Sequence, residues 1–582
     1  MSRISAGLAT AAAVAALAAP TAHAAPPLPF GHACVPQDGV LFCPTTSDAQ
    51  RVRSWDGVPL DVDVTLPSTG DGPFPTVVML HGWGGDKGTF ESHSPAGSYS
   101  NVFYARRGYA VVNYTARGFG RSCGALVSRT SPGCDRGWIH LADHRYEVRD
   151  TQYLLGRLVD QGLVKRDAIG VTGISYGGIQ TLSLARLRNR VRRVNGSFAR
   201  WKSPAGRPLA IRAGYARWPG SDMSYALQPN GRFLDFRTPR PGDSIRPGGV
   251  MKKSYLDGLY LTGLAGGFYE PAGGPFDSDI TTWKLLADRG EPARPRTLAV
   301  GRQLTRFHSW MGLSGPSAAL IVQNGWTDDL FPAEEALRVY RTFSGARGAR
   351  LSLQLGDLGH SRGSNDPAQG AVMLAQASAF FDFYLKGRGH TPRNGSVLAF
   401  QQTCPAGTGT LGPVRARSWG RLHPRTLTMR HRSPLRISSA GGSPETAKAI
   451  DPIGGGGACA SVAAGHDSGT AVIQRRFGRP FTMLGMPTVR SRIRTRGSGG
   501  FVAARLWDVF EGRQTLVSRG VYRLNDNQRG RIVFQLFGNG WRFAKGHRAK
   551  LELLGRDPSY LRTSNFDFSV RFAHTRVELP GR

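Results

Sequence analysis

Short apolar runs, separated by glycine and polar turns, recur between residue 60 and about residue 385. Residues 60–66 alternate apolar and polar positions, which is typical of a half-buried strand, whereas residues 75–80 and 168–171 are almost entirely apolar, as in a strand buried on both faces. Residues 180–187 and similar segments favour helices. Strands that alternate with helices predict a mostly parallel sheet covered by helices on both faces.

This alternation of predicted strands and helices is absent from two regions. Residues 215–314 are rich in proline, glycine and aromatic residues, and we expect them to form a cap over an active site, with most of the aromatic side chains packing the cap onto the core. From residue 396 onward the helical period disappears, residues 500–506 and 530–536 predict strands, and Asn539-Gly540 predicts a turn. We therefore expect a catalytic domain over residues 25–395 and an all-β sandwich over residues 396–582.

The N-terminus has the pattern of a secretory signal peptide. Residues 1–3 include a positive charge, residues 4–19 are rich in alanine and valine, and Ala22-His23-Ala24 is a small-residue cleavage pattern. We expect residues 1–24 to be removed, leaving a secreted protein that begins at Ala25. The apolar run is too short for a membrane span, and no later run has the necessary length.

The six cysteines support the same compartment, because disulfides persist in oxidising environments. They fall as three neighbouring pairs along the chain, and the pairing that closes the shortest loops is Cys34–Cys43, Cys123–Cys134 and Cys404–Cys459. No Cys-x-x-Cys pattern indicates a zinc ribbon or a redox site. We expect these three disulfides and no metal or organic cofactor.

Gly173-Ile-Ser175-Tyr-Gly177 lies where a predicted strand turns into a predicted helix, which is the context of a nucleophile elbow. Such a turn lifts the serine oxygen above the edge of the sheet, so Ser175 is the expected nucleophile. The motif alone recurs in unrelated proteins. The interpretation is strengthened by two later predicted strands, which are followed by Asp328 and by His360. The three residues therefore occur in the chain order Ser, Asp, His.

In this scheme His360 is the general base, and Asp328 holds the imidazole in the required tautomer. Asp329 and Asp357 are rival acids, which would otherwise be loop or helix-capping residues. The glycine-rich turn His81-Gly-Trp83-Gly-Gly85 follows an apolar strand, where α/β-hydrolases place part of the oxyanion hole. We expect the backbone amides of Trp83 and Tyr176 to hold the oxyanion.

The formal net charge is +35, which raises the question of a polyanionic partner. The basic residues are dispersed, and no zinc-finger spacing, RNA-binding signature or basic heptad helix is present, so we do not expect nucleic-acid binding. Loose association with an anionic cell wall is a partner interaction that this charge would allow. The oligomeric state is not indicated.

The arrangement resembles the X-Pro dipeptidyl-peptidase and cocaine-esterase-like serine hydrolases, peptidase family S15. The resemblance rests on the turn at residues 81–85, on residues 117–122, 173–178 and 324–332, and on Gly359-His360. In the C-terminal part it rests on residues 504–509 and 545–548. It implies an α/β-hydrolase fold with an inserted cap, a C-terminal jelly-roll sandwich, the triad Ser175, Asp328 and His360, and a structural role for His547.

The resemblance also implies an activity. The expected reaction is hydrolysis of N-terminal dipeptides through an acyl-serine intermediate, with carboxylic-ester or α-amino-acid-ester hydrolysis as the alternative. A peptide or small ester would be the substrate. Several members complete the oxyanion hole with a tyrosine hydroxyl, whereas this turn offers Trp83, so a backbone donor must substitute. An inactive secreted wall-binding protein is the remaining alternative.

Overall fold

The computed structural model describes residues 28–91, 99–240, 242–291, 293–343 and 348–582, together with Met1. The rest of the expected signal peptide, including the cleavage point before Ala25, lies outside the described residues. Among the described helices, none combines the length and the apolar character that a membrane crossing requires.

An eleven-stranded sheet forms the centre of the first domain, with the order β1-β2-β5-β7-β6-β8-β11-β12-β13-β14-β15. The strands from β7 to β14 run parallel, and Val171 of β8 lies opposite Val78 of β6 and Gly214 of β11. The bounds are β1 Val35–Gln37, β2 Val40–Cys43, β5 Val62–Pro67, β6 Phe74–Leu80, β7 Ala110–Tyr114, β8 Val164–Ile174, β11 Ile211–Arg217, β12 Ala319–Gly325, β13 Leu351–Gly356, β14 Val397–Gln401 and β15 Leu411–Ala416.

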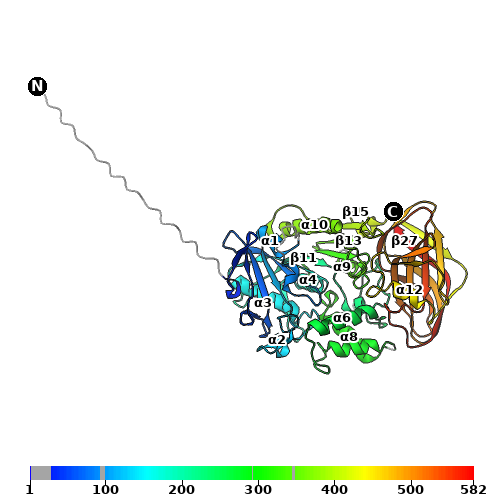
Figure 1. The fold of residues 1–582 in the computed structure, drawn as a ribbon, viewed down its shortest axis with the longest axis horizontal. Helices are drawn as coiled ribbons and strands as arrows, with labels where there is room; N and C mark the ends of the chain where they lie inside the picture. Colours follow the sequence, from blue (N-terminus) through cyan, green and yellow to red (C-terminus); the bar gives the residue numbers. More distant parts are fainter. Residues whose placement is uncertain (2–27, 92–98, 241, 292, 344–347) are drawn as a thin grey trace.

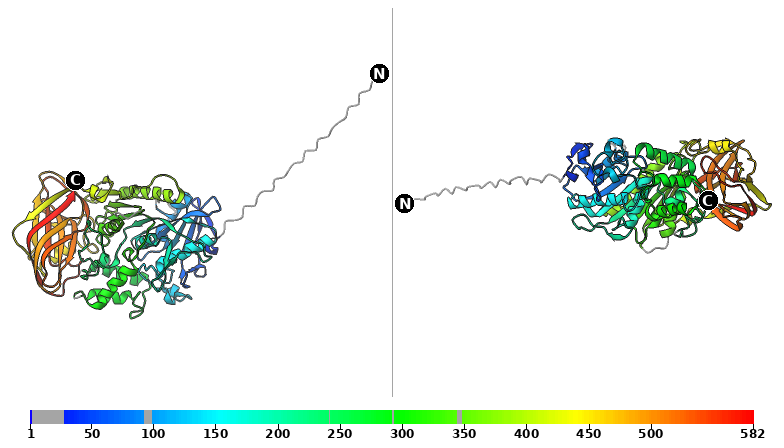
Figure 2. Two further views of the ribbon diagram at one scale, coloured as in Figure 1. Left: turned by 180° about the vertical axis from the view of Figure 1, so that it is seen from behind. Right: turned by 90° about the horizontal axis from the view of Figure 1, so that it is seen from below.

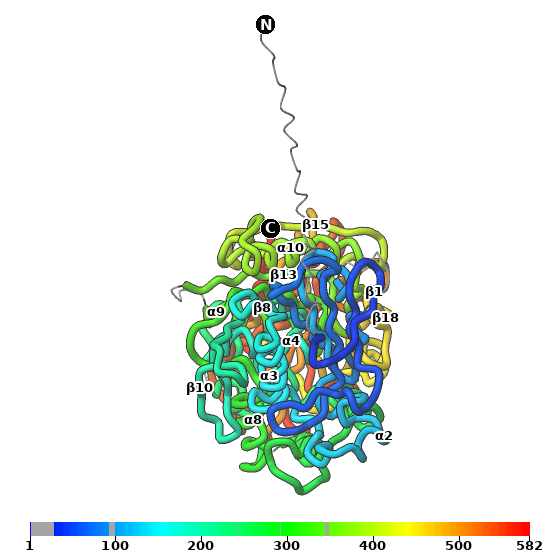
Figure 3. The backbone as a smooth tube through the Cα atoms, turned by 90° about the vertical axis from the view of Figure 1, so that its left-hand side faces the viewer, coloured from blue at the N-terminus to red at the C-terminus, as the bar shows by residue number. Residues whose placement is uncertain are grey.

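Helices cover both faces of this sheet, as the alternation of apolar runs predicts (Figure 3). On one face lie α3 (Glu147–Asp160), α4 (Tyr176–Leu187) and α9 (Ala333–Phe343), and on the other lie α1 (Asn101–Arg106) and α10 (Pro367–Lys386). The central strands are buried on both sides because each face packs against apolar helix positions.

The cap lies between β11 and β12. It consists of α5 (Met223–Leu227), α6 (Lys253–Gly266), α7 (Ile280–Asp288) and α8 (Pro295–Phe307), followed by the short helix η5 (Trp310–Gly312). Figure 1 shows α6 and α8 at the lower edge of the molecule, below β13 and α9. Shorter elements elsewhere are β3 (Val52–Arg53), β4 (Pro59–Leu60), α2 (Leu126–Arg129), β9 (Arg190–Arg192), β10 (Phe198–Arg200), α11 (Trp419–Leu422) and α12 (Pro444–Ala449), with the 3-10 helices η1 (Pro29–Gly31), η2 (Asp48–Gln50), η3 (Lys87–Phe90) and η4 (Cys134–Arg136).

Two antiparallel sheets form the C-terminal sandwich, which occupies the opposite end of the molecule from α3 (Figures 1 and 2). The first contains β16 (Arg425–His431), β17 (Leu435–Ser438), β20 (Phe481–Gly485), β21 (Thr488–Gly497), β24 (Arg529–Gln535), β25 (Asn539–Phe543) and β27 (Phe568–Gly581). The second contains β18 (Ser461–Ala463), β19 (Ala471–Arg476), β22 (Phe501–Phe510), β23 (Arg513–Arg523) and β26 (Arg548–Leu554). An apolar core fills the space between them. The expected fold class is confirmed.

The turn expected at Asn539-Gly540 is wrong, because both residues belong to β25. Gly540 is required by close packing: a Cβ there would lie 2.9 Å from both the Phe400 carbonyl oxygen and the Trp326 indole nitrogen. The glycine therefore lets the sandwich approach the hydrolase sheet. At this position close packing against Phe400 and Trp326, and not a turn, explains the glycine in the strand.

β14 and β15 belong to the hydrolase sheet although they lie beyond residue 395. We therefore propose that the boundary between the two domains lies between β15 and β16, later than the sequence suggests. The cysteines pair as expected, Cys34 with Cys43, Cys123 with Cys134 and Cys404 with Cys459. The last of these disulfides ties the loop after β14 to the sandwich.

Candidate active site

The turn at Ser175 has the backbone geometry expected of a nucleophile elbow, and the serine is half-buried. Ser175 lies between the end of β8 and the first residue of α4, with φ 54° and ψ −112°. A side chain at Gly177 would place its Cβ 2.0 Å from the Leu80 carbonyl oxygen, and one at Gly173 would lie 2.6 Å from the backbone of Gly177. Both glycines are therefore sterically required, and the strained serine is held by the packing around it.

The structure brings the three expected residues together. His360 Nε2 lies 2.8 Å from Ser175 Oγ, and His360 Nδ1 lies 2.7 Å from Asp328 Oδ2. Asp328 is fully buried, and its second oxygen, Oδ1, accepts hydrogen bonds from the amides of Leu330 and Phe331 at 3.0 and 2.9 Å. The carboxylate is thus fixed in place and oriented toward the imidazole. This is the hydrogen-bond order of a Ser-His-Asp triad.

Neither rival acid contacts His360. Asp329 Oδ2 lies 2.9 Å from Arg362 Nε and 3.2 Å from Arg519 Nε, so that its charge is balanced by two buried guanidinium groups. Asp357 accepts a hydrogen bond from Thr327 Oγ1 at 2.8 Å and shapes the turn before the histidine. Sequence order alone did not separate these neighbours, because their roles depend on side-chain direction.

The loop that carries the acid, residues 326–332, is also held by the other domain. Arg519 belongs to β23 of the sandwich, and the Tyr560 hydroxyl donates to the Asp329 carbonyl oxygen at 3.0 Å. From the cap, Lys252 Nζ donates to the Leu330 carbonyl oxygen at 2.8 Å, and burial lowers the pKa of Lys252 to about 8. Three parts of the chain thus converge on the loop that positions Asp328. The sequence carries no local signal for these contacts.

The turn after β6 passes close to the nucleophile, since a Cβ on Gly82 would lie 4.0 Å from Ser175 Cβ. Within the described residues, the backbone amides of Trp83 and Tyr176 have no hydrogen-bond acceptor, so both remain available to a ligand. The Trp83 indole Nε1 donates to the Leu259 carbonyl oxygen at 2.9 Å instead of facing the serine. The geometry is consistent with a backbone oxyanion hole at these two residues.

His81 is a structural residue. Its Nε2 accepts a hydrogen bond from the Ala116 amide at 2.9 Å, and its Nδ1 lies 2.7 Å from the Gly82 carbonyl oxygen. Burial lowers the pKa of His81, so the ring is neutral and both nitrogens are used. The imidazole therefore ties the oxyanion turn to the strand end beside it.

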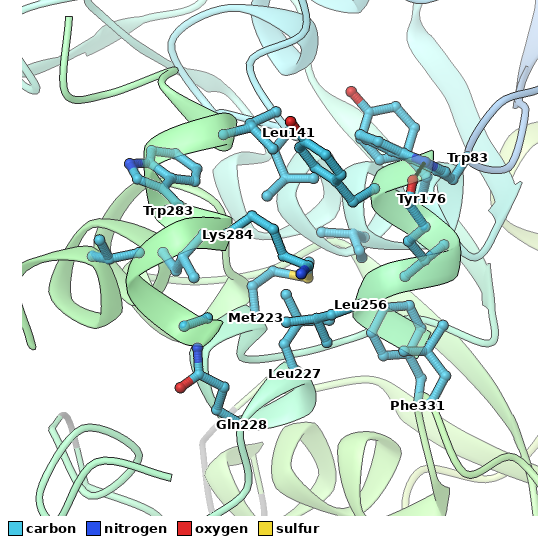
Figure 4. A pocket seen from close by; sticks show the side chains of 18 of the residues that line it. Trp83, Leu141, Tyr176, Met223, Leu227, Gln228, Leu256, Trp283, Lys284 and Phe331 are labelled. Atoms are coloured by element: carbon cyan, nitrogen blue, oxygen red, sulfur yellow. Dashed lines mark hydrogen bonds between the residues drawn. The ribbon is translucent and has the colours of Figure 1, made fainter. Parts of the chain in front are cut away.

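A cavity of about 110 Å³ opens at Ser175 and extends beneath the cap (Figure 4). Its walls are almost entirely apolar, and its cap side is formed by α5, α6, α7 and α8 together with Phe331. The apolar lining residues include Leu141, Ile179, Met223, Leu227, Leu256, Leu259, Ile280, Trp283, Val300, Leu304 and Leu330. Lys284 is the charged lining residue, and its Nζ lies within 2.8 Å of Asp257 and Asp288, which balance its charge.

No carboxylate among the described residues lines this cavity. The cap carboxylates considered from the sequence are engaged elsewhere. Asp222 and Asp279 accept hydrogen bonds at the N-termini of α5 and α7, Asp235 contacts the sandwich, Glu270 binds a serine hydroxyl, and Asp277 lies 3.0 Å from an arginine.

Glu147 is a buried group that sequence reasoning missed. Its Oε1 accepts hydrogen bonds from the His140 amide at 2.6 Å and from the Tyr176 hydroxyl at 3.1 Å, and burial raises its pKa to about 8. The segment between His140 and His144 suggested a surface helix, but it is a buried turn. This turn packs against the core, which explains why most of its residues are buried. No cluster of three metal-binding side chains occurs in the described part of the chain.

Comparison with known proteins agrees with this geometry. Residues 56–230 match the family model of X-Pro dipeptidyl-peptidase (S15 family). No curated protein sequence gave a significant match.

Solved structures share the fold along nearly the whole chain. A CocE/NonD family hydrolase from Staphylococcus aureus is 13% identical, with a TM-score of 0.58 and coverage of 93% of this chain and 94% of its own. An aminopeptidase from a Thaumarchaeota archaeon is 14% identical, with a TM-score of 0.59 and coverage of 94% and 97%. An α-amino acid ester hydrolase is 16% identical, with a TM-score of 0.58 and coverage of 94% and 98%.

At these identities the solved structures establish the fold alone. The family model adds a sequence relationship to the S15 family over residues 56–230, which include Ser175. Together with the Ser-His-Asp geometry, the family match over residues 56–230 supports a serine hydrolase related to the X-Pro dipeptidyl-peptidase (S15) family.

Proposed function

We propose that this protein hydrolyses carboxylic esters with an uncharged, apolar acyl group, using Ser175, His360 and Asp328 as its catalytic triad. The observation that carries the proposal is the cavity at Ser175, whose lining among the described residues is apolar and lacks a carboxylate. An apolar acyl chain would gain free energy from burial there, at roughly 25 cal/mol per Å² removed from water.

The proposed reaction has two halves. His360 Nε2 takes the Ser175 hydroxyl proton as Oγ attacks the ester carbonyl carbon, and the amides of Trp83 and Tyr176 stabilise the oxyanion. Collapse of this intermediate breaks the bond to the leaving alcohol, which receives the proton from His360. Water then attacks the acyl-serine with the same base, releasing the acid and restoring Ser175.

Cleavage of N-terminal dipeptides stays a prediction with less support. A dipeptidyl-peptidase must hold a free ammonium group, and leaving that charge unpaired in an apolar cavity is costly. Asp257 and Asp288, the carboxylates paired with Lys284, are neutralised by Lys284 and Lys253 together. The wall-binding alternative without activity is disfavoured because Ser175 lies within hydrogen-bond distance of His360.

Initial rates of the mature chain on p-nitrophenyl butyrate and on Ala-Pro-p-nitroanilide would test the proposal. We expect ester cleavage that is lost in Ser175→Ala and little anilide cleavage. Anilide cleavage faster than ester cleavage, lost in the same variant, would restore the dipeptidyl-peptidase assignment. Rates independent of Ser175 would refute the triad.

A pair of variants on α6 tests the acyl cavity. Leu256→Trp fills it, whereas Leu261→Trp adds the same group at a position that is 60% exposed. We expect Leu256→Trp to lower kcat/KM for the butyrate ester more than for the acetate ester, and Leu261→Trp to change neither. Equal loss on both esters would argue against this cavity as the acyl site.

We also propose that the chain is exported. The three disulfides support an oxidising compartment. N-terminal sequencing of protein recovered from the culture medium should begin at Ala25, and recovery of intact chain only from the cytoplasm would contradict export.

A further inference from the structure

The outer face of the first sandwich sheet carries rows of arginines that come from five different strands. In one row, Arg430 of β16 pairs with Arg576 of β27, which pairs in turn with Arg490 of β21. The Cβ atoms of directly opposed residues in antiparallel strands lie roughly 5 Å apart. Three guanidinium groups therefore stand side by side across adjacent strands.

A second row repeats this arrangement further along the same strands. Arg571 of β27 lies between Arg436 of β17 and Arg494 of β21, and Arg494 also faces Arg529 of β24. Between the rows, Arg492 lies opposite Arg531. We call these nine residues the arginine face.

All nine side chains point to the same side of the sheet. The residues between them on β21, such as Ser491 and Ile493, are buried, whereas Arg492 and Arg494 are exposed. Strand pleating brings every second residue to the same face, so arginines recur roughly every 7 Å along β21. The result is a two-dimensional array of positive charge on the outer face of the sheet.

Very little negative charge offsets this array. In the strands that bear the arginine face, all of which the structure describes, Glu578 is the one carboxylate. It lies 3.1 Å from Arg490 and 2.8 Å from Arg576. Arg492, Arg494 and Arg531 have no ion-pair partner among the described residues.

Directly opposed like charges destabilise a sheet. The rows therefore do not contribute to folding, and their regular spacing matches a ligand that presents many negative groups in series. Arginine suits such a ligand because its planar fork donates paired hydrogen bonds to carboxylate, sulfate or phosphate oxygens.

We propose that the arginine face binds an acidic polysaccharide, a glycan whose repeating units carry carboxylate or sulfate groups, and so retains the hydrolase on a glycan-rich surface. The three disulfides favour this partner, because they fit an oxidising, extracytoplasmic compartment where such glycans occur. This site lies on the sandwich and is separate from the cavity at Ser175.

Nucleic acid fits the face less well. Single-stranded binders combine charge with aromatic side chains on which bases stack. The described strands of the arginine face place no Phe, Tyr or Trp at their outward positions, and Phe236 contacts the row only at its end, where it packs under Arg490. The nine residues of the arginine face all lie on described β-strands, so the face itself offers no helix to enter a major groove.

The test measures binding of the full chain to heparin and to polygalacturonate over a range of salt concentrations, with duplex DNA as a third ligand. The triple variant Arg492→Ser, Arg494→Ser, Arg531→Ser removes charge from the arginine face. The control triple Arg136→Ser, Arg166→Ser, Arg200→Ser removes the same charge from exposed positions on the hydrolase domain. Thermal unfolding and ester hydrolysis confirm that each variant is folded.

We expect the face variant to bind the polysaccharides about tenfold to a hundredfold more weakly near physiological salt, with a salt slope lower by about 2 to 3, while the control triple stays within about twofold of wild type. An equal loss of polysaccharide affinity in both triple variants would show that only net charge matters, and it would overturn the proposal. Absence of wild-type binding to both polysaccharides would also overturn it. Tighter binding of duplex DNA would assign the face to nucleic acid instead.

Discussion

Asp328 and Asp329 are adjacent carboxylates whose roles the structure separates, so matched substitutions provide a strict test. Asp328 accepts four hydrogen bonds: Oδ1 from the amides of Leu330 and Phe331, and Oδ2 from the amide and the Nδ1 of His360. Asparagine has a single acceptor oxygen. In Asp328→Asn the amide NH₂ must therefore face either the two backbone donors or His360.

The amide loses least by keeping its oxygen on the two backbone donors. Its NH₂ then faces His360 Nδ1 and selects the imidazole tautomer with the proton on Nε2, which cannot accept the Ser175 proton. The corresponding substitution in the Ser-His-Asp template lowers kcat by about 10⁴. That factor equals about 5.4 kcal/mol of transition-state stabilisation. KM should change little, because Asp328 does not line the acyl cavity.

Asp329→Asn should produce a different defect. Arg362 and Arg519 are each about 2% exposed or less, and the substitution leaves both charges without their shared carboxylate. Breaking a buried pair costs about 3–5 kcal/mol of stability. We expect a lower unfolding midpoint in denaturant and a kcat within about tenfold of wild type, measured where the variant is folded.

The assay is single-ester kinetics and urea unfolding on both variants, with Asp357→Asn as a third comparison. A large fall in kcat for Asp329→Asn, with normal kcat for Asp328→Asn, would assign the acid to Asp329 and refute the triad. A similar fall for both variants at full stability would show that the carboxylates act together.

Three further predictions concern stability. Burial raises the pKa of Glu147 from 4.5 to about 8, so between these pH values the folded chain keeps a proton that the unfolded chain loses. The free energy of unfolding should therefore fall by a few kcal/mol as the pH rises from about 4.5 to about 8. Urea titrations of Glu147→Gln should show a flatter pH dependence. Removing the Cys404–Cys459 disulfide, which closes a separation of 55 residues, should lower the free energy of unfolding by about 4 kcal/mol. Arg494→Thr should raise the melting temperature, because it relieves like-charge pairs worth about 0.2–1 kcal/mol each.

Each of these has a contrary outcome. An equally steep pH dependence in Glu147→Gln would place the titrating group elsewhere. A double serine variant at positions 404 and 459 with unchanged stability would mean that the loop is already constrained by the domain contact. A lower melting temperature in Arg494→Thr would mean that the arginine contributes packing that outweighs its repulsion.

The amino-acid sequence was sufficient to predict the features that depend on neighbouring residues. The elbow required glycines on both sides of Ser175, the strands showed a period of two or an apolar run, and the short-loop pairing identified the three disulfides. These signals are local, because backbone sterics and side-chain periodicity act over a few residues. The chain order Ser, Asp, His follows from the strand ends, and Asp328 is preferred over Asp329 because its loop has the acid, any residue, two apolar residues, proline layout that is usual in α/β-hydrolases.

Long-range packing fixes three other features: which carboxylate faces His360, the absence of a carboxylate from the described lining of the acyl cavity, and the continuation of a strand through Asn539-Gly540. The arginine face has the same origin. Alternate arginines in β21 are visible in the sequence, but the rows arise because residues as far apart as Arg430 and Arg576, 146 positions, pair in register. Register and side-chain direction depend on long-range packing, and a local pattern does not contain that information.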